Sequence, residues 1–205
     1  MRSLVTFGSQ HNGIAQFQVC GDWDLLCKGA TAAVRGNAWT EWVQSNIVPA
    51  QYYRSVDETT GLGSEEYLNG SRFLADVNNE RGEKNEVYKQ RLAKLDTFAM
   101  YVFENDTTVI PKESGWFAEV NATDGTVWPL RERKIYKEDW IGLRALDEKG
   151  GLEFRTVEGA KHMAISEPLL RTAFEDFYGP EKRTGLVETG RSWWNQVIMA
   201  GTNDW

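Results

Sequence analysis

Residues 97–103 read Thr-Phe-Ala-Met-Tyr-Val-Phe, and the four residues that follow them read Glu-Asn-Asp-Thr. A near-continuous apolar run of this length, rich in aromatic side chains, is typical of a strand buried on both faces of a parallel sheet. The polar residues after it form a turn-forming cluster that ends the strand. The sequence therefore predicts a buried strand over 97–103, with Asp106 in the loop at its carboxyl end.

A second strand is predicted downstream. A helix expected over Asp139–Leu146 is followed by a Gly-Gly turn and by an apolar strand over Leu152–Val157, and the loop after this strand contains His162. Ser166 is placed to cap a last helix over Glu167–Phe177, with a proline tolerated in its first turn. This alternation of strands and helices is typical of an α/β fold with a parallel sheet.

Three further elements are predicted ahead of the first buried strand. An apolar strand over Leu4–Phe7 stops at Gly8, a helical pattern runs over Cys20–Asn46 and is closed by Pro49, and an exposed amphipathic helix covers Asn85–Leu95. A chain that opens inside a strand is typical of a piece of a larger domain, although an ordinary protein can also begin in this way.

Length and composition limit the classes to which the chain can belong. Of its 205 residues, 41% are hydrophobic and 26% are charged, which are the fractions of an ordinary globular domain. Acidic side chains outnumber basic ones by 30 to 23, and the net charge of −7 disfavours nucleic acid as a partner. No run of about 18 apolar residues predicts a transmembrane helix. The apolar stretch at the N-terminus is too short for a signal peptide.

Two cysteines and three glycosylation sequons bear on the cellular compartment. Six residues separate Cys20 from Cys27, which does not fit a Cys-x-x-Cys zinc motif, and the two histidines lie far away in sequence. A local disulfide and a pair of free thiols are both compatible with this spacing. Asn69, Asn105 and Asn121 each begin an Asn-x-Ser/Thr sequon, a motif that is also common by chance. Together these features favour a disulfide and an oxidising, glycosylating compartment.

Asp106 and His162 are the candidate catalytic residues. Each is expected in a loop after a strand, where the functional groups of open parallel sheets lie. The acid precedes the histidine by 56 positions, and this order matches the second half of the nucleophile, acid and base of α/β-hydrolases. In that arrangement the carboxylate orients the imidazole, which takes the proton of a serine. By itself the pair is weak evidence, because a lone histidine after a strand is more often structural or merely exposed, and an aspartate in a turn is by default a turn former.

A serine nucleophile is not found in the expected motif. No Gly-x-Ser-x-Gly pentapeptide occurs in the 205 residues. Ser9 lacks the flanking residues of the motif, whereas Ser192 lies after the histidine and has Trp194 in place of the second glycine. The residues alone therefore provide a candidate acid and base without a nucleophile.

Four collinear stretches resemble the palmitoyl-protein thioesterase family, and they extend over about 4–177 of the chain. They are Gly8–Gly13, Phe73–Gly82, Phe103–Thr107 with Pro111 and Trp116-Phe117 shortly behind it, and Glu158–His162. The ten-residue block at 73–82 is the most specific of them. One local departure is that His162 follows Gly159 by three residues, where the family pattern has two.

The resemblance implies the C-terminal part of an α/β-hydrolase fold. Residues 1–178 would form a partial domain, with a helical insertion over about 12–95 that forms the acyl-binding subdomain, and acid- and histidine-bearing strands over about 96–178. Residues 179–205 would be a C-terminal tail of unassigned role. The family has its signal peptide, first strands, oxyanion-hole segment and serine elbow in a region that would precede Met1. The resemblance thus implies a fragment that is inactive alone.

The resemblance also assigns roles to individual residues. Asp106 matches the triad acid and His162 the triad base. Tyr52 and Tyr53 fall where the helical insertion lines the fatty-acyl groove. His11 lies in a Gln-His-x-Gly turn near the active site, where a structural contribution to the substrate site is favoured over a catalytic one.

Further residues match features of a secreted or lysosomal glycoprotein. Cys20 and Cys27 match a local disulfide pair, and Asn69 and Asn105 match glycosylation sites, with Asn121 added from its own sequon. For the full-length protein, the resemblance implies a location in the lysosome or vacuole, or secretion.

The activity implied is hydrolysis of the thioester between a long fatty acyl chain and a protein cysteine, without a metal or organic cofactor. The expected partners are S-acylated proteins or peptides and fatty acyl thioesters. Two alternatives stay open. One is a lipid or carboxylester hydrolase of the same fold, because a fold does not fix the substrate. The other is a non-catalytic, truncated remnant.

Overall fold

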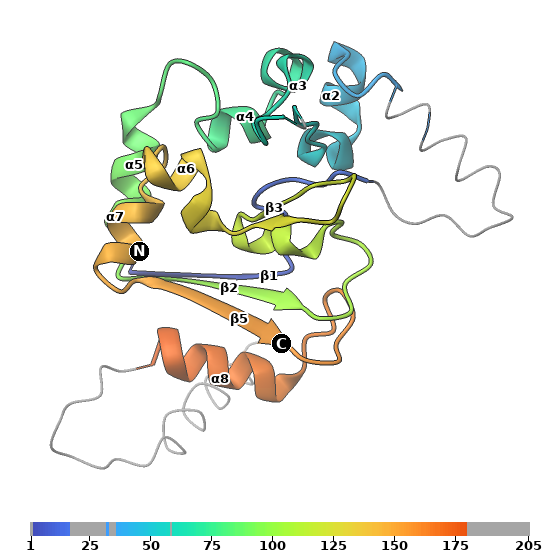
Figure 1. The fold of residues 1–205 in the computed structure, drawn as a ribbon. Helices are drawn as coiled ribbons and strands as arrows, with labels where there is room; N and C mark the ends of the chain where they lie inside the picture. Colours follow the sequence, from blue (N-terminus) through green and yellow to red (C-terminus); the bar gives the residue numbers. More distant parts are fainter. Residues whose placement is uncertain (1, 17–31, 33–35, 58, 180–205) are drawn as a thin grey trace, which may run out of the picture.

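A parallel sheet with helices on both faces organises the part of the chain that the structure describes (Figure 1). The computed structural model describes residues 2–16, 32, 36–57 and 59–179. The sheet consists of β1 (Ser3–Phe7), β2 (Thr97–Phe103) and β5 (Leu152–Val157) in the order β1-β2-β5. Because all three strands are parallel, their carboxyl ends lie at one edge of the sheet.

β2 lies at the centre of this sheet and pairs with both other strands. Six of its seven residues are buried, and Phe98 and Met100 point to one face while Ala99 and Tyr101 point to the other. Burial on both faces explains why the strand appears in the sequence as an unbroken apolar run. The bounds of β2 and β5 are those predicted from the sequence, and the predicted N-terminal strand is confirmed as β1.

One face of the sheet is covered by α8 (Glu167–Phe177), whose bounds also match the prediction. Ser166 caps this helix, since its hydroxyl accepts a hydrogen bond from the backbone N–H of Leu169 at 3.3 Å. Ala173 is buried against Ala99 and Tyr101 of β2. A small residue at the point of contact lets the helix approach the sheet closely.

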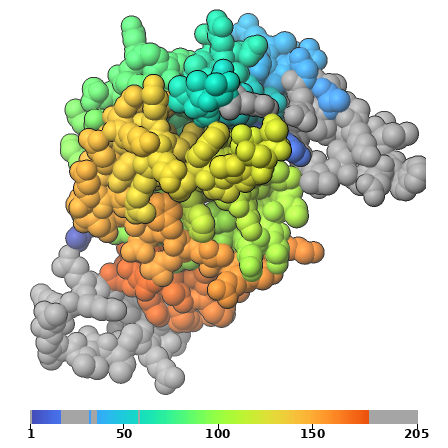
Figure 2. Space-filling view, in the orientation of Figure 1, coloured from blue at the N-terminus to red at the C-terminus, as the bar shows by residue number. Residues whose placement is uncertain are grey.

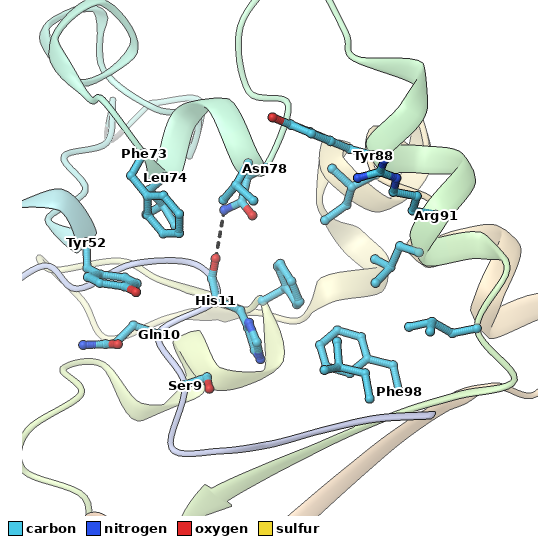
Figure 3. Close-up of a pocket in the computed structure, with 16 residues that line it drawn as sticks. Ser9, Gln10, His11, Tyr52, Phe73, Leu74, Asn78, Tyr88, Arg91 and Phe98 are labelled. Atoms are coloured by element: carbon cyan, nitrogen blue, oxygen red, sulfur yellow. Dashed lines mark hydrogen bonds between the residues drawn. The ribbon is translucent and has the colours of Figure 1, made fainter. Parts of the chain in front are cut away.

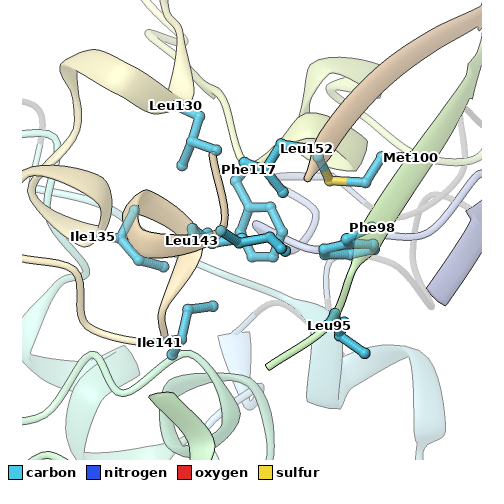
Figure 4. Packing of buried hydrophobic residues seen from close by; sticks show 10 residues of the cluster. Leu95, Phe98, Met100, Phe117, Leu130, Ile135, Ile141, Leu143 and Leu152 are labelled. Atoms are coloured by element: carbon cyan, nitrogen blue, oxygen red, sulfur yellow. The ribbon is translucent and has the colours of Figure 1, made fainter. Parts of the chain in front are cut away.

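The opposite face carries the largest core cluster, between the sheet and the helices α5 (Glu86–Ala93), α6 (Lys134–Lys137) and α7 (Leu143–Glu148) (Figures 1 and 4). The buried members of this cluster are Leu95, Phe98, Met100, Phe117, Leu130, Ile135, Ile141, Leu143, Leu146 and Leu152. The space-filling view shows that the segment around 120–140, in yellow, forms much of the front surface over this core (Figure 2).

Between β1 and β2 the chain forms α2 (Glu41–Asn46), α3 (Glu65–Gly70), α4 (Leu74–Val77) and α5, together with a 3₁₀ turn over Val48–Tyr52. The helix predicted from Cys20 falls largely outside the described residues. Within the described part of that stretch, residues 32 and 36 are helical, and α2 begins at Glu41, where the Thr40 hydroxyl accepts from the backbone N–H of Val43. The predicted exposed helix over Asn85–Leu95 is confirmed as α5, none of whose residues is buried.

The helix predicted over Asp139–Leu146 is displaced in the structure, and α7 begins only at Leu143. Asp139 and Gly142 have positive φ angles of 52° and 88°, which break a right-handed helix. The carboxylate of Asp139 instead accepts a hydrogen bond from the backbone N–H of Arg144 at 2.9 Å. The sequence reasoning also missed α6 and the short hairpin of β3 (Glu119–Val120) and β4 (Val127–Trp128).

Candidate active site

Asp106 lies in the turn that follows β2, and its side chain is almost fully buried, with 1% exposed. Its Oδ1 atom accepts hydrogen bonds from the backbone N–H groups of Thr108 at 2.8 Å and Val109 at 3.0 Å. These bonds are those of an Asx turn, in which a short acidic side chain replaces part of the backbone bonding. The turn fixes the carboxylate and leaves Oδ2 free for a second partner.

That second partner is His162, in the loop after β5. The distance from His162 Nδ1 to Asp106 Oδ2 is 2.7 Å, within the range of a charge-assisted hydrogen bond. The geometry fits an imidazole that donates its Nδ1–H to the carboxylate and keeps Nε2 available as a base. The imidazole also packs edge-on against Phe103, with ring centroids 6.2 Å apart. The structure therefore brings the predicted acid and base together.

The two loops that carry this pair are tied to each other by hydrogen bonds that backbone N–H groups donate. The N–H of Asn105 donates to the carbonyl of Ala160 at 2.9 Å, and the N–H of Gly159 donates to the carboxylate of Glu104 at 2.6 Å. Asp106 and His162 are consequently held in place through the main chain as well as through their own contact.

An apolar cavity of about 450 Å³ lies between the sheet and the helices α4 and α5 (Figure 3). Apolar side chains form most of its wall, including Leu4, Phe98 and Ile141. Ser9 and Gln10, in the loop after β1, line it at another point. A cavity of this size and lining fits an apolar ligand.

His11 also lines this cavity, where its ring stacks on Phe117 with centroids 4.8 Å apart. Its Nε2 atom lies 2.9 Å from the hydroxyl of Thr6, and its carbonyl accepts a hydrogen bond from the Asn78 side chain at 2.8 Å. Burial lowers the pKa of His11 to about 4. The imidazole is therefore neutral at neutral pH and acts as part of the apolar wall.

The structure separates the two tyrosines that the sequence analysis placed in the acyl groove. Tyr52 lines the cavity and contacts Phe73 edge-on, with ring centroids 5.3 Å apart. Tyr53 is not among the lining residues and instead stacks on Trp39, also at 5.3 Å. Tyr52 ends the 3₁₀ turn and Tyr53 has an extended backbone, and the two adjacent side chains have different surroundings.

The sequon asparagines all lie at or near the surface of the described residues. Asn69 in α3 and Asn105 in the turn after β2 are exposed. Asn121 is half-buried, and its side-chain oxygen accepts from the N–H of Thr123 at 2.7 Å. The predicted disulfide between Cys20 and Cys27 falls outside the described residues.

A buried network of charged groups was not predicted from the sequence. The Arg54 guanidinium donates to the carboxylates of Glu80, at 2.9 Å, and Glu119. Arg133 approaches Glu119 at 3.5 Å, and the Tyr67 hydroxyl donates to Glu80 at 2.6 Å. Burial opposes the ionisation of Glu80, but attraction and hydrogen bonds from Arg54 outweigh it and hold the pKa of Glu80 below its usual value.

This network also anchors the loop after β1. The Asn12 side chain donates to Glu119 at 3.0 Å and accepts from Arg133 at 2.6 Å. Ser114 binds the same loop by donating its hydroxyl to the carbonyl of Gly13. No sequence signal could have revealed the network, because its members come from distant parts of the chain.

Across the described residues, no group of three or more His, Cys, Asp or Glu side chains is arranged to hold a metal ion. In the same part of the chain, no helix is both long and apolar enough to cross a membrane.

Comparison with known proteins identifies the family. The family model described as palmitoyl protein thioesterase matches residues 1–162. The chain belongs to the palmitoyl-protein thioesterase family. Its α/β fold with a parallel sheet agrees with the α/β-hydrolase fold of that family.

Relatives among characterised proteins agree with this membership. The chain is 36% identical to palmitoyl-protein thioesterase 1 of Caenorhabditis elegans over 171 residues, which are 83% of this chain and 55% of the relative. It is 43% identical to palmitoyl-protein thioesterase 3 of Dictyostelium discoideum over 115 residues, which are 56% of this chain and 38% of the relative. It is 28% identical over 114 residues to lysosomal thioesterase PPT2-B of Xenopus laevis, covering 55% of this chain and 38% of the relative. The chain thus spans about half the length of these palmitoyl-protein thioesterase relatives, or less.

Proposed function

We propose that this chain is part of a palmitoyl-protein thioesterase, which removes long-chain fatty acyl groups from cysteine thioesters with a Ser-Asp-His triad. Asp106 is the acid of this triad and His162 the base. The observation that carries the proposal is their 2.7 Å contact at the carboxyl ends of adjacent parallel strands. Family membership and the names of the relatives support the same activity.

The proposed reaction is acyl transfer in two steps. The serine hydroxyl attacks the thioester carbonyl while His162 Nε2 takes its proton, and the imidazolium then gives that proton to the leaving thiolate. Water repeats the sequence on the acyl-enzyme and releases the fatty acid. Asp106 keeps the imidazole in one tautomer and stabilises its positive charge. This chemistry requires neither a metal nor an organic cofactor.

The apolar cavity is the proposed site of the fatty acyl chain. It is lined by Tyr52 and His11, and its wall has few polar groups that would bind water in place of an acyl chain. The helices between β1 and β2, within about residues 12–95, supply one side of the cavity and would form the acyl-binding subdomain. Tyr53, which stacks on Trp39 outside the cavity, would support this subdomain without contacting the fatty acyl group.

The Gly-x-Ser-x-Gly motif does not occur in these 205 residues. The nucleophile is therefore proposed to come from sequence outside them. The chain by itself would then be inactive, because neither a nucleophile nor the oxyanion-hole donors would be present. The experiments below use this chain joined to the nucleophile-bearing segment that the family has. We call this longer protein the serine-complete protein. Reading the coding sequence upstream of Met1 for an in-frame motif would show whether that segment belongs to the same gene.

The proposed partners are S-acylated proteins or peptides and fatty acyl thioesters. For the full-length protein we propose the lysosome or vacuole, or secretion. The sequons at Asn69, Asn105 and Asn121 and the cysteine pair support this location, as does the lysosomal name of the Xenopus relative.

The test is hydrolysis of a fluorogenic palmitoyl thioester by the serine-complete protein. Hydrolysis of the corresponding palmitoyl oxygen ester is measured in parallel. We expect turnover of the thioester that is lost in His162→Ala. A preference for the oxygen ester would instead support the lipid or carboxylester hydrolase. No turnover of either ester by a folded protein would support a non-catalytic remnant.

A further inference from the structure

Gly8 is the residue that directly follows β1, and it lies against the imidazole of His162. Its N–H donates to the carbonyl of Tyr101 at 2.8 Å, which continues the hydrogen bonding between β1 and β2 by one residue. The φ angle of Gly8 is +56°, and the next two residues, Ser9 and Gln10, turn away to line the apolar cavity (Figure 3). Gly8 therefore connects the sheet, the histidine and the cavity.

The contact between Gly8 and His162 leaves too little space for a Cβ atom unless a neighbouring side chain shifts. A Cβ atom on Gly8 would lie 3.1 Å from both Cε1 and Nδ1 of His162, and 3.1 Å from Cε2 of Phe103. These separations are shorter than ordinary van der Waals contacts, so at least one neighbour would have to move. Nδ1 is the atom that contacts Asp106.

The histidine is the neighbour that can move. Phe103 is fully buried within the central strand, whereas 26% of the His162 side chain is exposed. Close packing holds Phe103 on one side of the imidazole, and the backbone of Gly8 closes another. A methyl group on Gly8 would accordingly be accommodated by a shift of the imidazole by a few tenths of an ångström, which would disturb its alignment with Asp106.

We propose that Gly8 is a positioning residue for the reaction: its missing side chain lets the β1 loop press on the His162 imidazole and hold it in line with Asp106. This inference rests on the proposed role of His162 as the base. The loop is itself held firmly, because Asn12 is bound by Glu119 and Arg133, and the His11 carbonyl is bound by Asn78. Because these bonds fix the loop, the position of Gly8 beside the imidazole is fixed as well.

The test compares Gly8→Ala with Gly125→Ala in the serine-complete protein. Gly125 has a similar φ of +74°, but a Cβ there would meet no atom within 4 Å, so the control has the backbone strain without the contact. We expect Gly8→Ala to lower kcat by about 10- to 100-fold with little change in KM. We expect Gly125→Ala to keep the wild-type kcat.

A second measurement separates this inference from the proposed function. With histidine labelled at Cε1, the NMR signal of His162, identified by its loss in His162→Gln, should shift in Gly8→Ala and stay in place in Gly125→Ala. If the wild-type protein has no thioesterase activity, the proposed function fails, while the signal still tests the contact. Equal effects of the two alanines, or a loss of kcat without a shift of the His162 signal, would overturn the role of Gly8.

A third variant keeps the test decisive if Gly8→Ala does not fold. Phe103→Leu removes the ring that packs edge-on against the imidazole beside Gly8 and leaves Gly8 intact. If packing by Phe103 and Gly8 holds the imidazole in place, this change should lower kcat with little change in KM. Wild-type kcat in folded Phe103→Leu would contradict the inference.

Discussion

Asp106 presents only one of its carboxylate oxygens to His162, because the other accepts two backbone hydrogen bonds from its own turn. The turn thus orients the carboxylate independently of its contact with the imidazole. An Asp in this setting fixes both the position and the tautomer of its histidine. This division between the two oxygens makes the acid sensitive to replacement by an amide.

Asp106→Asn in the serine-complete protein should lower kcat by about 10⁴-fold, somewhat less than or about as much as His162→Ala. The amide can keep the turn through its oxygen but presents an NH₂ group to Nδ1, which favours the wrong tautomer. Asp124→Asn is the matched control, since Asp124 also accepts from an N–H two residues ahead, at 2.9 Å, but is exposed. Steady-state kinetics with a palmitoyl thioester would check both variants. Wild-type kcat in Asp106→Asn combined with inactivity of Asp124→Asn would refute the triad assignment.

Tyr52→Ala should raise KM for long acyl thioesters by about tenfold or more, because its ring lines the cavity and removal would lose apolar contact area. Tyr53→Ala should leave KM unchanged, since its ring packs on Trp39 outside the cavity. The difference should shrink for short acyl chains that do not reach the ring. Comparing KM for a series of chain lengths would measure it. Equal effects of the two substitutions at every length would argue against the cavity as the acyl site.

The stability of the fold should decrease as the pH falls from about 6.5 to about 4, in part because of His11. Its folded-state pKa of about 4 is lower than the unfolded value of 6.5, so the unfolded chain binds the proton more readily in this window. The loss is on the order of 2 kcal/mol, reduced from the full shift because one side of the ring faces the cavity. Above this window the contribution of His11 is constant.

Denaturant unfolding of the serine-complete protein at pH 7 and pH 4.5 would measure this effect. His11→Gln should lose less stability between the two pH values than the wild type, because the variant has no imidazole to protonate. Other titrating groups contribute equally to both proteins and cancel in the difference. An identical pH dependence of the two proteins would contradict the assignment.

Cys20 and Cys27 should be joined by a disulfide in the secreted full-length protein. Closing so short a loop is worth roughly 2–3 kcal/mol. Mass spectrometry of peptides prepared with and without reductant would detect the link. Two thiols that both react with an alkylating agent before reduction would disprove it and would weaken the case for an oxidising compartment.

The 205-residue chain expressed alone should be inactive and poorly stable, with a tendency to aggregate. Within the described sheet, β1 lies at an edge with one side of its backbone unpaired, and exposed apolar edges promote aggregation. The chain also contains nine tryptophans, whose large surfaces add to this tendency where they are left uncovered. Solubility and hydrolysis of a palmitoyl thioester would be measured together. A soluble monomer with cooperative unfolding would contradict the first expectation, and turnover abolished by His162→Ala the second.

The strands could be predicted from the sequence because their signals are local. The 97–103 run is apolar throughout, and Ser166 precedes the last helix with a side chain suited to its cap. Since β2 and β5 are parallel neighbours, the loops after them had to lie close together, and so did Asp106 and His162. The sequence pattern thus placed both residues in loops after strands, whereas the adjacency of β2 and β5, which brings acid and base into contact, is shown by the structure.

Other features depend on contacts between distant residues and have no local signal. The contact between Gly8 and His162 joins residues more than 150 positions apart. Tyr52 contacts Phe73 and the cavity whereas Tyr53 contacts Trp39, and these partners lie well away from the two tyrosines in sequence. The late start of α7 follows from the positive φ of Asp139, a conformation that the sequence pattern alone did not indicate.

The buried charges also have a consequence for the order in which the molecule assembles. Arg54, Glu80, Glu119, Arg133 and Asn12 are scattered along the chain, and the bond between Asn12 and Arg133 spans 121 positions. Contacts with such large sequence separation are expected to close late, after the local helices have formed. Interactions absent from the transition state govern the rate of unfolding rather than the rate of folding. We therefore expect the network to slow the unfolding of the native state more than it changes the rate of folding.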